Sequence, residues 1–338
     1  MKLYRLLSEG GRARPVAGEA PVPEPGPGEV RLRVVAASLN YRDILILAAA
    51  ADGSLDGRIP LSDAAGIVDM LGVDVTGWKE GDRVAASFFL NWISGPFDTA
   101  CLPTSLGGRA TDGVLADFIT VPAAALVAVP EHLSFAEAAT LPCAAVTAWH
   151  GLVVRAGLRS GDTLLVQGTG GVALFGLQFA VALGARAIVL SSSDEKLERA
   201  RALGAAGLIN YRTTPDWHEA VVAVTDGKGA SHILELGGRE TYRRTLKAVA
   251  AGGKIVQIGV LTGAGPKPDL ERLQTVNADI IGVTVGSTAH FSAMNAFISE
   301  KKLVPVIDRV FPFGGVPEAY EYLRAGAHFG KVVVGVSG

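Results

Sequence analysis

The stretch that decides the fold is TLLVQGTGGVA, residues 163–173, an apolar strand that runs into a glycine turn. The turn has the pattern G-x-G-x-x-A, and a helical run through Leu183 follows it. Gly168 permits the tight turn, Gly170 lets the backbone approach a pyrophosphate, and Ala173 permits close packing of the helix. The N–H groups at the start of such a helix bind phosphate. The alternative is a glycine turn that joins strand and helix without a ligand, and the surrounding pattern disfavours it.

Around this turn, apolar strands alternate with helical runs, which is typical of βαβ units on a parallel sheet. A helix is expected before them, over 135–154. The expected strands cover 163–167, 187–190, 207–209, 231–236, 254–258 and 280–285. Six strands make a full dinucleotide-binding sheet. The sequence therefore predicts an α/β fold with a Rossmann doubly wound parallel sheet.

The first third of the chain has a different pattern, with short β segments separated by Gly, Pro and Asp. These segments predict a small irregular barrel, and they cover 30–36, 66–70, 83–87 and 118–121. A helix over 291–300 and a strand over 331–336 are expected to return to this first domain. Residues 91–113 form a long loop, and such loops in compact domains are usually functional or mobile.

Composition excludes several classes of protein. The 338 residues suffice for two domains; 49% are hydrophobic and 19% are charged, with 42 glycines and 17 prolines. The 31 basic and 33 acidic residues nearly cancel, so no strong overall field would hold nucleic acid or an anionic membrane. Two cysteines make neither a disulfide framework nor a four-cysteine zinc lobe. No apolar stretch reaches the roughly 18 residues of a membrane span. We expect an unprocessed cytoplasmic protein.

The end of the second strand of the dinucleotide-binding pattern selects the nucleotide, because an Asp or Glu there would favour NAD and repel a 2′-phosphate. Ser191, Ser192 and Ser193 occupy this place, and Lys196 follows closely. Hydroxyls and an ammonium suit a phosphate dianion, which favours NADP(H). Ser193 with the acidic residues after it can equally be a helix N-cap, and both interpretations can hold together.

Several motifs together resemble the medium-chain dehydrogenase/reductases, in particular their zinc-free quinone oxidoreductase-like branch. They lie at residues 37–43, 59–66, 81–84, 139–143, 166–172, 209–212 and 328–332, together with Gly204. The resemblance implies a GroES-like β-barrel catalytic domain over 1–126 and 289–338, interrupted by a Rossmann NADP-binding domain over 127–288. It implies an active site in the cleft between them, and homodimers or homotetramers joined through the last Rossmann strand.

The resemblance also implies which residues contact the cofactor. Lys196 and Tyr211 match the pair that contacts the 2′-phosphate, and Thr147, Gly171 and Val172 match nicotinamide or pyrophosphate contacts. The full set of expected cofactor contacts is Thr147, Gly168, Gly170, Gly171, Val172, Ser191, Ser192, Lys196, Tyr211, Gly259 and Lys331.

The sequence departs from the zinc-dependent relatives at their metal ligands. The matching positions hold Asn40, Ser62 with Asp63, and Cys143. A lone Cys beside an Asp falls short of the three protein ligands of a catalytic zinc. We therefore expect no metal, and hydride transfer to an acceptor that is already electrophilic, such as a quinone or a C=C conjugated to a carbonyl.

Such a reaction needs a hydrogen-bond donor for the developing enolate or phenolate oxygen. Tyr41 through its hydroxyl and Asn40 through its amide are the catalytic candidates. Each has a structural alternative: Asn40 as a strand-end residue that bonds its own backbone, Tyr41 as a packed aromatic. Arg42 and Asp43 are expected to pair with each other or to brace the loop.

Other residues are expected to line a substrate pocket: Ser62, Phe88, Trp92, Cys143 and His290. Phe88 and Trp92 either face a planar acceptor or form the core of their loop. Cys143 is expected to pack as a small apolar residue rather than to react.

Three functions remain open from sequence. The first is an NADPH-dependent reductase of quinones or α,β-unsaturated carbonyls, and the second an NADP-dependent alcohol dehydrogenase or ketone reductase. The resemblance adds a third, because some members of the branch are lens structural proteins or bind RNA while they hold NADPH. The near-neutral charge and the lack of a basic run with aromatics disfavour RNA. The expected partners are a small-molecule substrate and a second copy of the chain, with no nucleic acid and no membrane.

Overall fold

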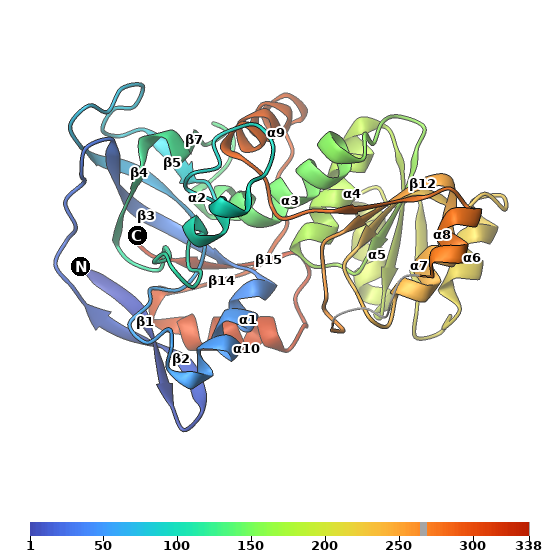
Figure 1. Cartoon of the computed structure of the whole chain (residues 1–338), viewed down its shortest axis with the longest axis horizontal. Coiled ribbons are helices and arrows are strands. Elements are labelled where there is room, and N and C mark those ends of the chain that lie inside the picture. The colour runs from blue at the N-terminus through green and yellow to red at the C-terminus, as the bar shows by residue number, and fades with distance from the viewer. Residues whose placement is uncertain (264–268, 338) are drawn as a thin grey trace. The chain divides into compact units, whose positions relative to one another are not determined.

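The computed structural model describes residues 1–263 and 269–337, which form two compact units. Unit 2 is Thr147–Val285, and unit 1 is Met1–Val146 together with the chain from Gly286 onward. In the colours of Figure 1, unit 2 runs from green to orange. The first boundary falls later than the expected residue 127. Residues 127–146 stay with unit 1 because β7 pairs with β5, and because α2 contacts β3 and β4.

Unit 2 is built on a parallel sheet, with six strands among the described residues. The strand order is β10-β9-β8-β11-β12-β13. The chain adds strands on one side of β8 first and then on the other side, as in a doubly wound dinucleotide-binding sheet. The strands are β8 (Thr163–Gln167), β9 (Arg186–Ser191), β10 (Gly207–Asn210), β11 (Ala230–Glu235), β12 (Val249–Gln257) and β13 (Asp279–Gly282). The helices are α4 (Gly171–Leu183), α5 (Asp194–Ala202), α6 (Trp217–Val224), α7 (Tyr242–Ala248) and α8 (Leu270–Thr275). The expected α/β class is confirmed.

The central strand β8 shows why this sheet forms. Leu164, Leu165 and Val166 are fully buried, because helices on both faces leave a parallel strand no exposed side. Burial of each such side chain contributes on the order of 1.5–3 kcal/mol. The strand therefore positions the glycine turn that follows it on a rigid support.

Unit 1 is built around β3 (Glu29–Leu39), the long strand at the centre of a seven-stranded sheet in the described part of the chain. The strand order is β14-β15-β3-β4-β5-β7, and β6 also pairs with β3. The other strands of this sheet are β4 (Asp63–Leu71), β5 (Arg83–Ala86), β6 (Phe118–Pro122), β7 (Leu126–Ala128), β14 (Ile307–Phe311) and β15 (Lys331–Gly335). A separate hairpin joins β1 (Lys2–Glu9) to β2 (Arg12–Glu19). The tail thus returns to unit 1 through β15, as expected.

The helices of unit 1 are α1 (Tyr41–Ala49), α2 (Phe135–Ala138), α9 (Thr288–Lys301) and α10 (Val316–Arg324), with η1 (Ala50–Asp52), η2 (Thr99–Thr104), η3 (Ala123–Ala125) and η6 (Phe313–Gly315) as 3₁₀ turns. The short helix α3 (Val146–Trp149) crosses the boundary into unit 2. The helix expected over 135–154 is interrupted by two π-helical segments, η4 (Leu141–Ala145) and η5 (His150–Arg155). Pro142 lacks a backbone N–H, so a regular α-helix cannot run through η4. Across the described ranges, no helix is long and apolar enough to cross a membrane.

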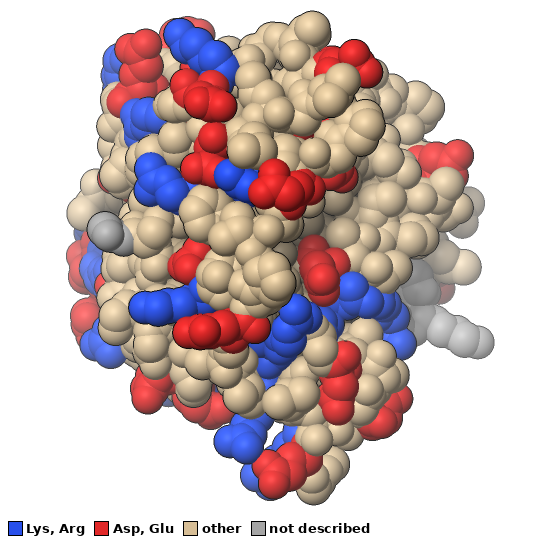
Figure 2. Space-filling view, turned by 90° about the vertical axis from the view of Figure 1, so that its left-hand side faces the viewer, with Lys and Arg blue, Asp and Glu red and all other residues tan. Residues whose placement is uncertain are grey.

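Charges are mixed on the face shown in Figure 2, where lysines and arginines alternate with aspartates and glutamates. No broad region of one sign stands out on that face. This distribution agrees with the formal net charge of −2.

Candidate active site and nucleotide-binding site

A buried polar cluster lies in unit 1 where four chain segments meet. These are the end of β3, the start of β4, the start of β15 and the π-helical segment η4. The antiparallel registers pair Ser38 with Asp63 and Leu39 with Val332, so Asn40 and Lys331 become neighbours. The cluster is thus positioned by sheet register, although its members are far apart in sequence.

The Lys331 ammonium is the positive charge of this cluster. It donates to the Leu39 carbonyl at 2.7 Å and to Asn40 Oδ1 at 2.5 Å. Lys331 is only 3% exposed, and burial lowers its pKa, while the nearby Asp63, Cys143 and Asp43 oppose that shift. Lys331 was expected at the cofactor, but its ammonium donates to the side chain of Asn40 in the structure.

The carboxylate of Asp63 belongs to the same cluster and acts electrostatically on this ammonium. Ser62 Oγ donates to Asp63 Oδ1 at 2.6 Å, and the Cys143 N–H donates to Asp63 Oδ2 at 3.1 Å. Ser62 and Asp63 are fully buried. The thiol of Cys143 has its pKa raised by burial and by the nearby Asp63 charge, so it is a protonated, weakly reactive group.

Arg42 and Asp43 brace the start of α1, as expected. Their side chains lie 3.6 Å apart, and the Asp43 carboxylate accepts the Asn40 N–H at 2.7 Å. Arg42 also donates to the Leu106 carbonyl at 3.1 Å and lies 4.7 Å from the centre of the Phe88 ring. Tyr41 follows Asn40 at the first position of α1 and is 43% exposed.

These residues do not fit a catalytic zinc ion. Neither Asn40 nor Lys331 belongs to the usual zinc ligands, so Cys143 and Asp63 alone fall short of the three protein ligands of a catalytic zinc ion. Asp63 already accepts bonds from Ser62 and Cys143. Within residues 1–263 and 269–337, no group of three or more His, Cys, Asp or Glu could hold a metal ion. Asp63 interacts electrostatically with the Lys331 ammonium of the same cluster.

The aromatic residues expected in the substrate pocket pack against other rings of unit 1, Phe88 against Phe89 and Trp92 against Phe89, Phe97 and His290. Trp92 is 3% exposed, its indole N–H donates to the Gly95 carbonyl at 3.0 Å, and its ring lies 4.9 Å from that of Phe97. This packing favours the loop-core alternative for Trp92. His290 lies edge-on to Trp92 at 5.8 Å, its Nδ1 accepts the Ser287 N–H at 3.2 Å, and burial lowers its pKa.

Unit 2 presents the features of a dinucleotide-binding turn. Gly168 has φ of +84°, a backbone conformation that favours glycine, and its N–H donates to the Leu190 carbonyl at 2.8 Å. Gly170 is the N-cap residue of α4, and no described side chain caps this helix. The first N–H groups of α4 therefore need an outside partner, and the pyrophosphate of a dinucleotide supplies one. The turn fits such a cofactor. Gly171 and Val172 open the helix, and Thr147 is buried where unit 2 begins.

The residues expected at the ribose end gather at the carboxyl edge of β9 and β10. The parallel register pairs Ser191 with Asn210, and the Tyr211 N–H donates to the Ser191 carbonyl at 3.0 Å. Ser193 caps α5 through Lys196 N–H at 3.3 Å, so the N-cap interpretation holds. Ser191 is 3% exposed and its Oγ accepts the Ser193 N–H at 3.3 Å. Ser192, Lys196 and Tyr211 are therefore the more accessible members of this group.

A second buried polar network, which the sequence analysis missed, supports the glycine turn. Glu235, fully buried at the end of β11, accepts bonds from Gln167 Nε2 at 2.7 Å and Thr241 Oγ1 at 2.6 Å, and from Thr245. Gln167 Oε1 in turn accepts the Gly237 N–H at 3.1 Å. The network joins the ends of β8 and β11. Its signal in the sequence is a polar residue at the end of each of two buried apolar strands.

Gly259, expected at the cofactor, has a structural reason to be glycine. A Cβ atom there would lie 2.2 Å from the Leu236 carbonyl oxygen. The close approach of two loops at the edge of the sheet therefore requires glycine at this position, whether or not a cofactor contacts it.

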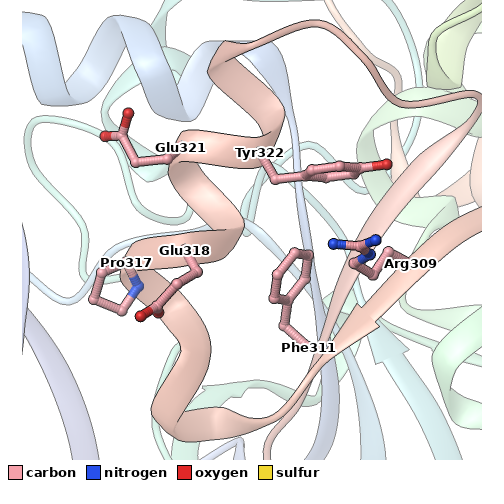
Figure 3. Close-up of a pocket in the computed structure, with 6 residues that line it drawn as sticks. All are labelled: Arg309, Phe311, Pro317, Glu318, Glu321 and Tyr322. Atoms are coloured by element: carbon pink, nitrogen blue, oxygen red, sulfur yellow. The ribbon is translucent and has the colours of Figure 1, made fainter.

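A surface hollow of about 410 Å³ lies elsewhere on unit 1, between β14 and α10 (Figure 3). Arg309 lies 4.7 Å from the centre of the Tyr322 ring and 5.6 Å from that of Phe311. The helix contributes Pro317, Glu318 and Glu321 (Figure 3). Arg309 thus contacts both aromatic rings of the hollow, and none of the lining residues belongs to the polar cluster.

Comparisons with known proteins agree with this geometry. Residues 26–131 match the alcohol dehydrogenase GroES-like domain, and residues 171–300 match the zinc-binding dehydrogenase family. A zinc-type alcohol dehydrogenase-like protein of Schizosaccharomyces pombe is 44% identical over 315 residues, 91% of each chain. An NADPH-dependent alkenal/one oxidoreductase of Arabidopsis thaliana is 33% identical and covers 93% of this chain and 73% of that protein. A crystal structure described as an alcohol dehydrogenase of Sinorhizobium meliloti is 42% identical, with a TM-score of 0.91 over 99% of this chain and 98% of that one.

The fold and the two sites define a two-unit oxidoreductase of the dinucleotide-binding class. The chain belongs to the medium-chain dehydrogenase/reductase superfamily, whose relatives include enone reductases and alcohol dehydrogenases.

Proposed function

We propose that this oxidoreductase transfers a hydride from NADPH to a quinone or an α,β-unsaturated carbonyl compound without zinc. The observation that carries the proposal is the polar cluster of unit 1. Where zinc-dependent relatives would have metal ligands, it holds Asn40, Asp63 and Cys143 around the Lys331 ammonium. A conjugated acceptor suits such a site because it is electrophilic without a Lewis acid.

Donors in unit 1 supply what the acceptor needs. When bound, NADPH supplies the hydride and is oxidised to NADP⁺. The hydride and its electron pair add to the β-carbon of an enone, the C=C electrons move to the oxygen as an enolate, and water protonates the α-carbon. The enolate oxygen needs a hydrogen-bond donor, and the Asn40 amide and the Tyr41 hydroxyl are the candidates. One such donor contributes about a hundredfold or more to kcat in comparable sites.

NADPH is the cofactor we propose because of the group at the ends of β9 and β10. Ser192, Lys196 and Tyr211 supply two hydroxyls and a positive charge for a 2′-phosphate. Ser191 ends β9 where an NAD-binding chain would carry an acidic residue. The name of the Arabidopsis relative, NADPH-dependent alkenal/one oxidoreductase, agrees with both the cofactor and the acceptor class.

The second candidate is an NADP-dependent alcohol dehydrogenase. The names of the Schizosaccharomyces relative and of the Sinorhizobium structure favour it. Such an enzyme would reduce an isolated carbonyl group, with Tyr41 as the donor to the carbonyl oxygen.

A substrate panel separates the two candidates. NADPH oxidation is followed at fixed pH with 1,4-benzoquinone, an acyclic enone, an aldehyde and a ketone. We expect turnover of the quinone or the enone only. Turnover of the aldehyde or the ketone at a similar or higher kcat/KM would reject the proposal in favour of the alcohol dehydrogenase.

We also propose a homodimer joined through β13. This strand pairs with β12 alone in the described sheet, and an edge strand offers unpaired backbone groups to a second copy. Light scattering after size-exclusion chromatography tests this. A mass near twice 34.9 kDa is expected, and a mass of one chain at micromolar concentration would contradict it.

A further inference from the structure

The side-chain amide of Asn40 is held from one side only. Its Oδ1 accepts a hydrogen bond from the Lys331 ammonium at 2.5 Å. Its Nδ2 is buried and has no hydrogen-bond partner among the described residues. Asn40 is 9% exposed, so water does not freely satisfy this N–H₂ group. A buried donor without a partner costs about 1–3 kcal/mol, which marks a place where an outside acceptor would be stabilised.

Lysine fixes which end of the amide faces it. An ammonium has three donors and no acceptor, so only the oxygen of Asn40 can face Lys331 at hydrogen-bond distance. The Nδ2 group must then lie on the other side. Two further contacts hold the pair: the Leu39 carbonyl accepts Lys331, and the Asp43 carboxylate accepts the Asn40 N–H. The amide therefore has one orientation, set by a charged neighbour.

The ammonium also strengthens the remaining donor. A cation on the oxygen of an amide draws electron density from its nitrogen, and bonds in such chains reinforce one another in a buried site. Asp63, Asp43 and Cys143 are the titratable groups that act on Lys331. The negative charge of the first two favours the charged ammonium, which the orientation of Asn40 requires.

We propose that Lys331 is a positioning residue, which turns the Asn40 amide so that Nδ2 donates to the acceptor oxygen as negative charge develops there. The proposal rests on the proposed function. It assigns Lys331 a role in the acceptor site, in place of the expected cofactor contact. The ammonium touches Asn40 and not the acceptor, so its effect on the rate passes through the amide.

A double-mutant cycle tests this role. The variants are Lys331→Met, which removes the charge and the donor, Asn40→Ala, and the two together, with Lys331→Gln as the conservative variant. The readout is kcat with whichever acceptor the wild type turns over. We expect Lys331→Met and Asn40→Ala each to lower kcat about a hundredfold. The double variant should be no slower than Asn40→Ala alone, because both changes remove the same donor.

Lys331→Gln keeps a neutral N–H donor for Asn40 Oδ1 and should recover about tenfold of the kcat lost in Lys331→Met. NADPH affinity, measured by fluorescence titration, should stay within about twofold in every variant. The exposed Lys79→Met is the matched control for loss of a lysine charge and should retain wild-type kcat. Lys331→Gln also guards against a Lys331→Met variant that fails to fold.

Three results would overturn the proposal: a kcat for Asn40→Ala equal to that of the wild type, a multiplicative loss in the double variant, or a weakened NADPH affinity with unchanged kcat in Lys331→Gln. The last would restore Lys331 to the cofactor. Failure of the proposed function would give a different result, namely turnover of ketones alone. The double-mutant cycle can still be measured with a ketone in that case.

Discussion

Asp43 is a buried acid in the first turn of α1, and only 2% of its surface is exposed. Burial raises its pKa to about 6, although Arg42 and the Asn40 N–H oppose that shift. The folded protein thus binds a proton at Asp43 at a pH where the unfolded chain does not.

The sign of the resulting pH dependence follows from this raised pKa. The stabilisation is complete below the unfolded pKa of 3.8 and is lost as pH rises through about 6. Relative to Asp43→Asn, the wild type should lose on the order of 2–3 kcal/mol of unfolding free energy between pH 4 and pH 7. Urea denaturation of both proteins across this range measures the difference. If the unfolding free energies of the two proteins changed equally with pH, the result would contradict the raised pKa of Asp43.

Cys143 should be chemically inert in the folded protein. Burial and Asp63 raise the pKa of its thiol, and the thiolate is the reactive form. With iodoacetamide at pH 8, we expect alkylation of Cys143 to be at least about a hundredfold slower in the native protein than in urea. Mass spectrometry of the digested protein gives the rate. Comparable native and unfolded rates would show that the thiol is neither buried nor influenced by Asp63.

A substitution of Lys196 tests the proposed preference for NADPH over NADH. Lys196→Ala removes a charge-assisted contact to the 2′-phosphate, so KM for NADPH should rise about tenfold or more while KM for NADH changes less than twofold. The exposed Lys228→Ala, in a turn of the same unit, is the control. Equal effects on both nucleotides would assign the selectivity to another group.

Secondary-structure elements could be predicted where the local pattern alone decides them. The strand over 163–167 has the predicted bounds because an apolar run ends at a glycine turn. The hairpin of β1 and β2 was missed, because mixed polar and apolar residues give its strands no strong alternation. The helix over 135–154 was predicted as continuous, since its periodicity is helical even though Pro142 and two π segments divide it.

The residue directly before β15 has to be a glycine. Gly330 has φ of +93°, and a Cβ atom there would lie 2.3 Å from the Val306 carbonyl oxygen. Gly330→Ala should therefore destabilise unit 1 by about 3 kcal/mol, from backbone strain and a steric clash together. Gly326→Ala is the control, since that glycine also has positive φ but nothing within 4 Å, and about 1 kcal/mol is expected. Equal losses, measured by urea denaturation, would exclude the clash.

At the scale of the whole molecule, the sequence motifs predicted the folds of the two units better than they predicted the side-chain contacts of the polar cluster. Asn40, Ser62 and Cys143, which their motifs predicted to be site residues, lie in the polar cluster. The bond between Lys331 and Asn40 spans 291 residues, and only the register of β15 on β3 creates it. The burial of Trp92 and the Glu235 network likewise arise from tertiary packing, which a linear pattern does not contain.

The central claim is that the reaction needs no metal, because a lysine ammonium supplies the charge beside Asp63. The most direct measurement is the rate of NADPH oxidation with the preferred quinone or enone after chelation, in samples whose zinc content is measured by mass spectrometry. We expect the rate per chain to be unchanged when the zinc content is far below one ion per chain, and zinc addition to give no increase. A rate that falls in proportion to zinc removal and returns with one zinc ion per chain would contradict the account.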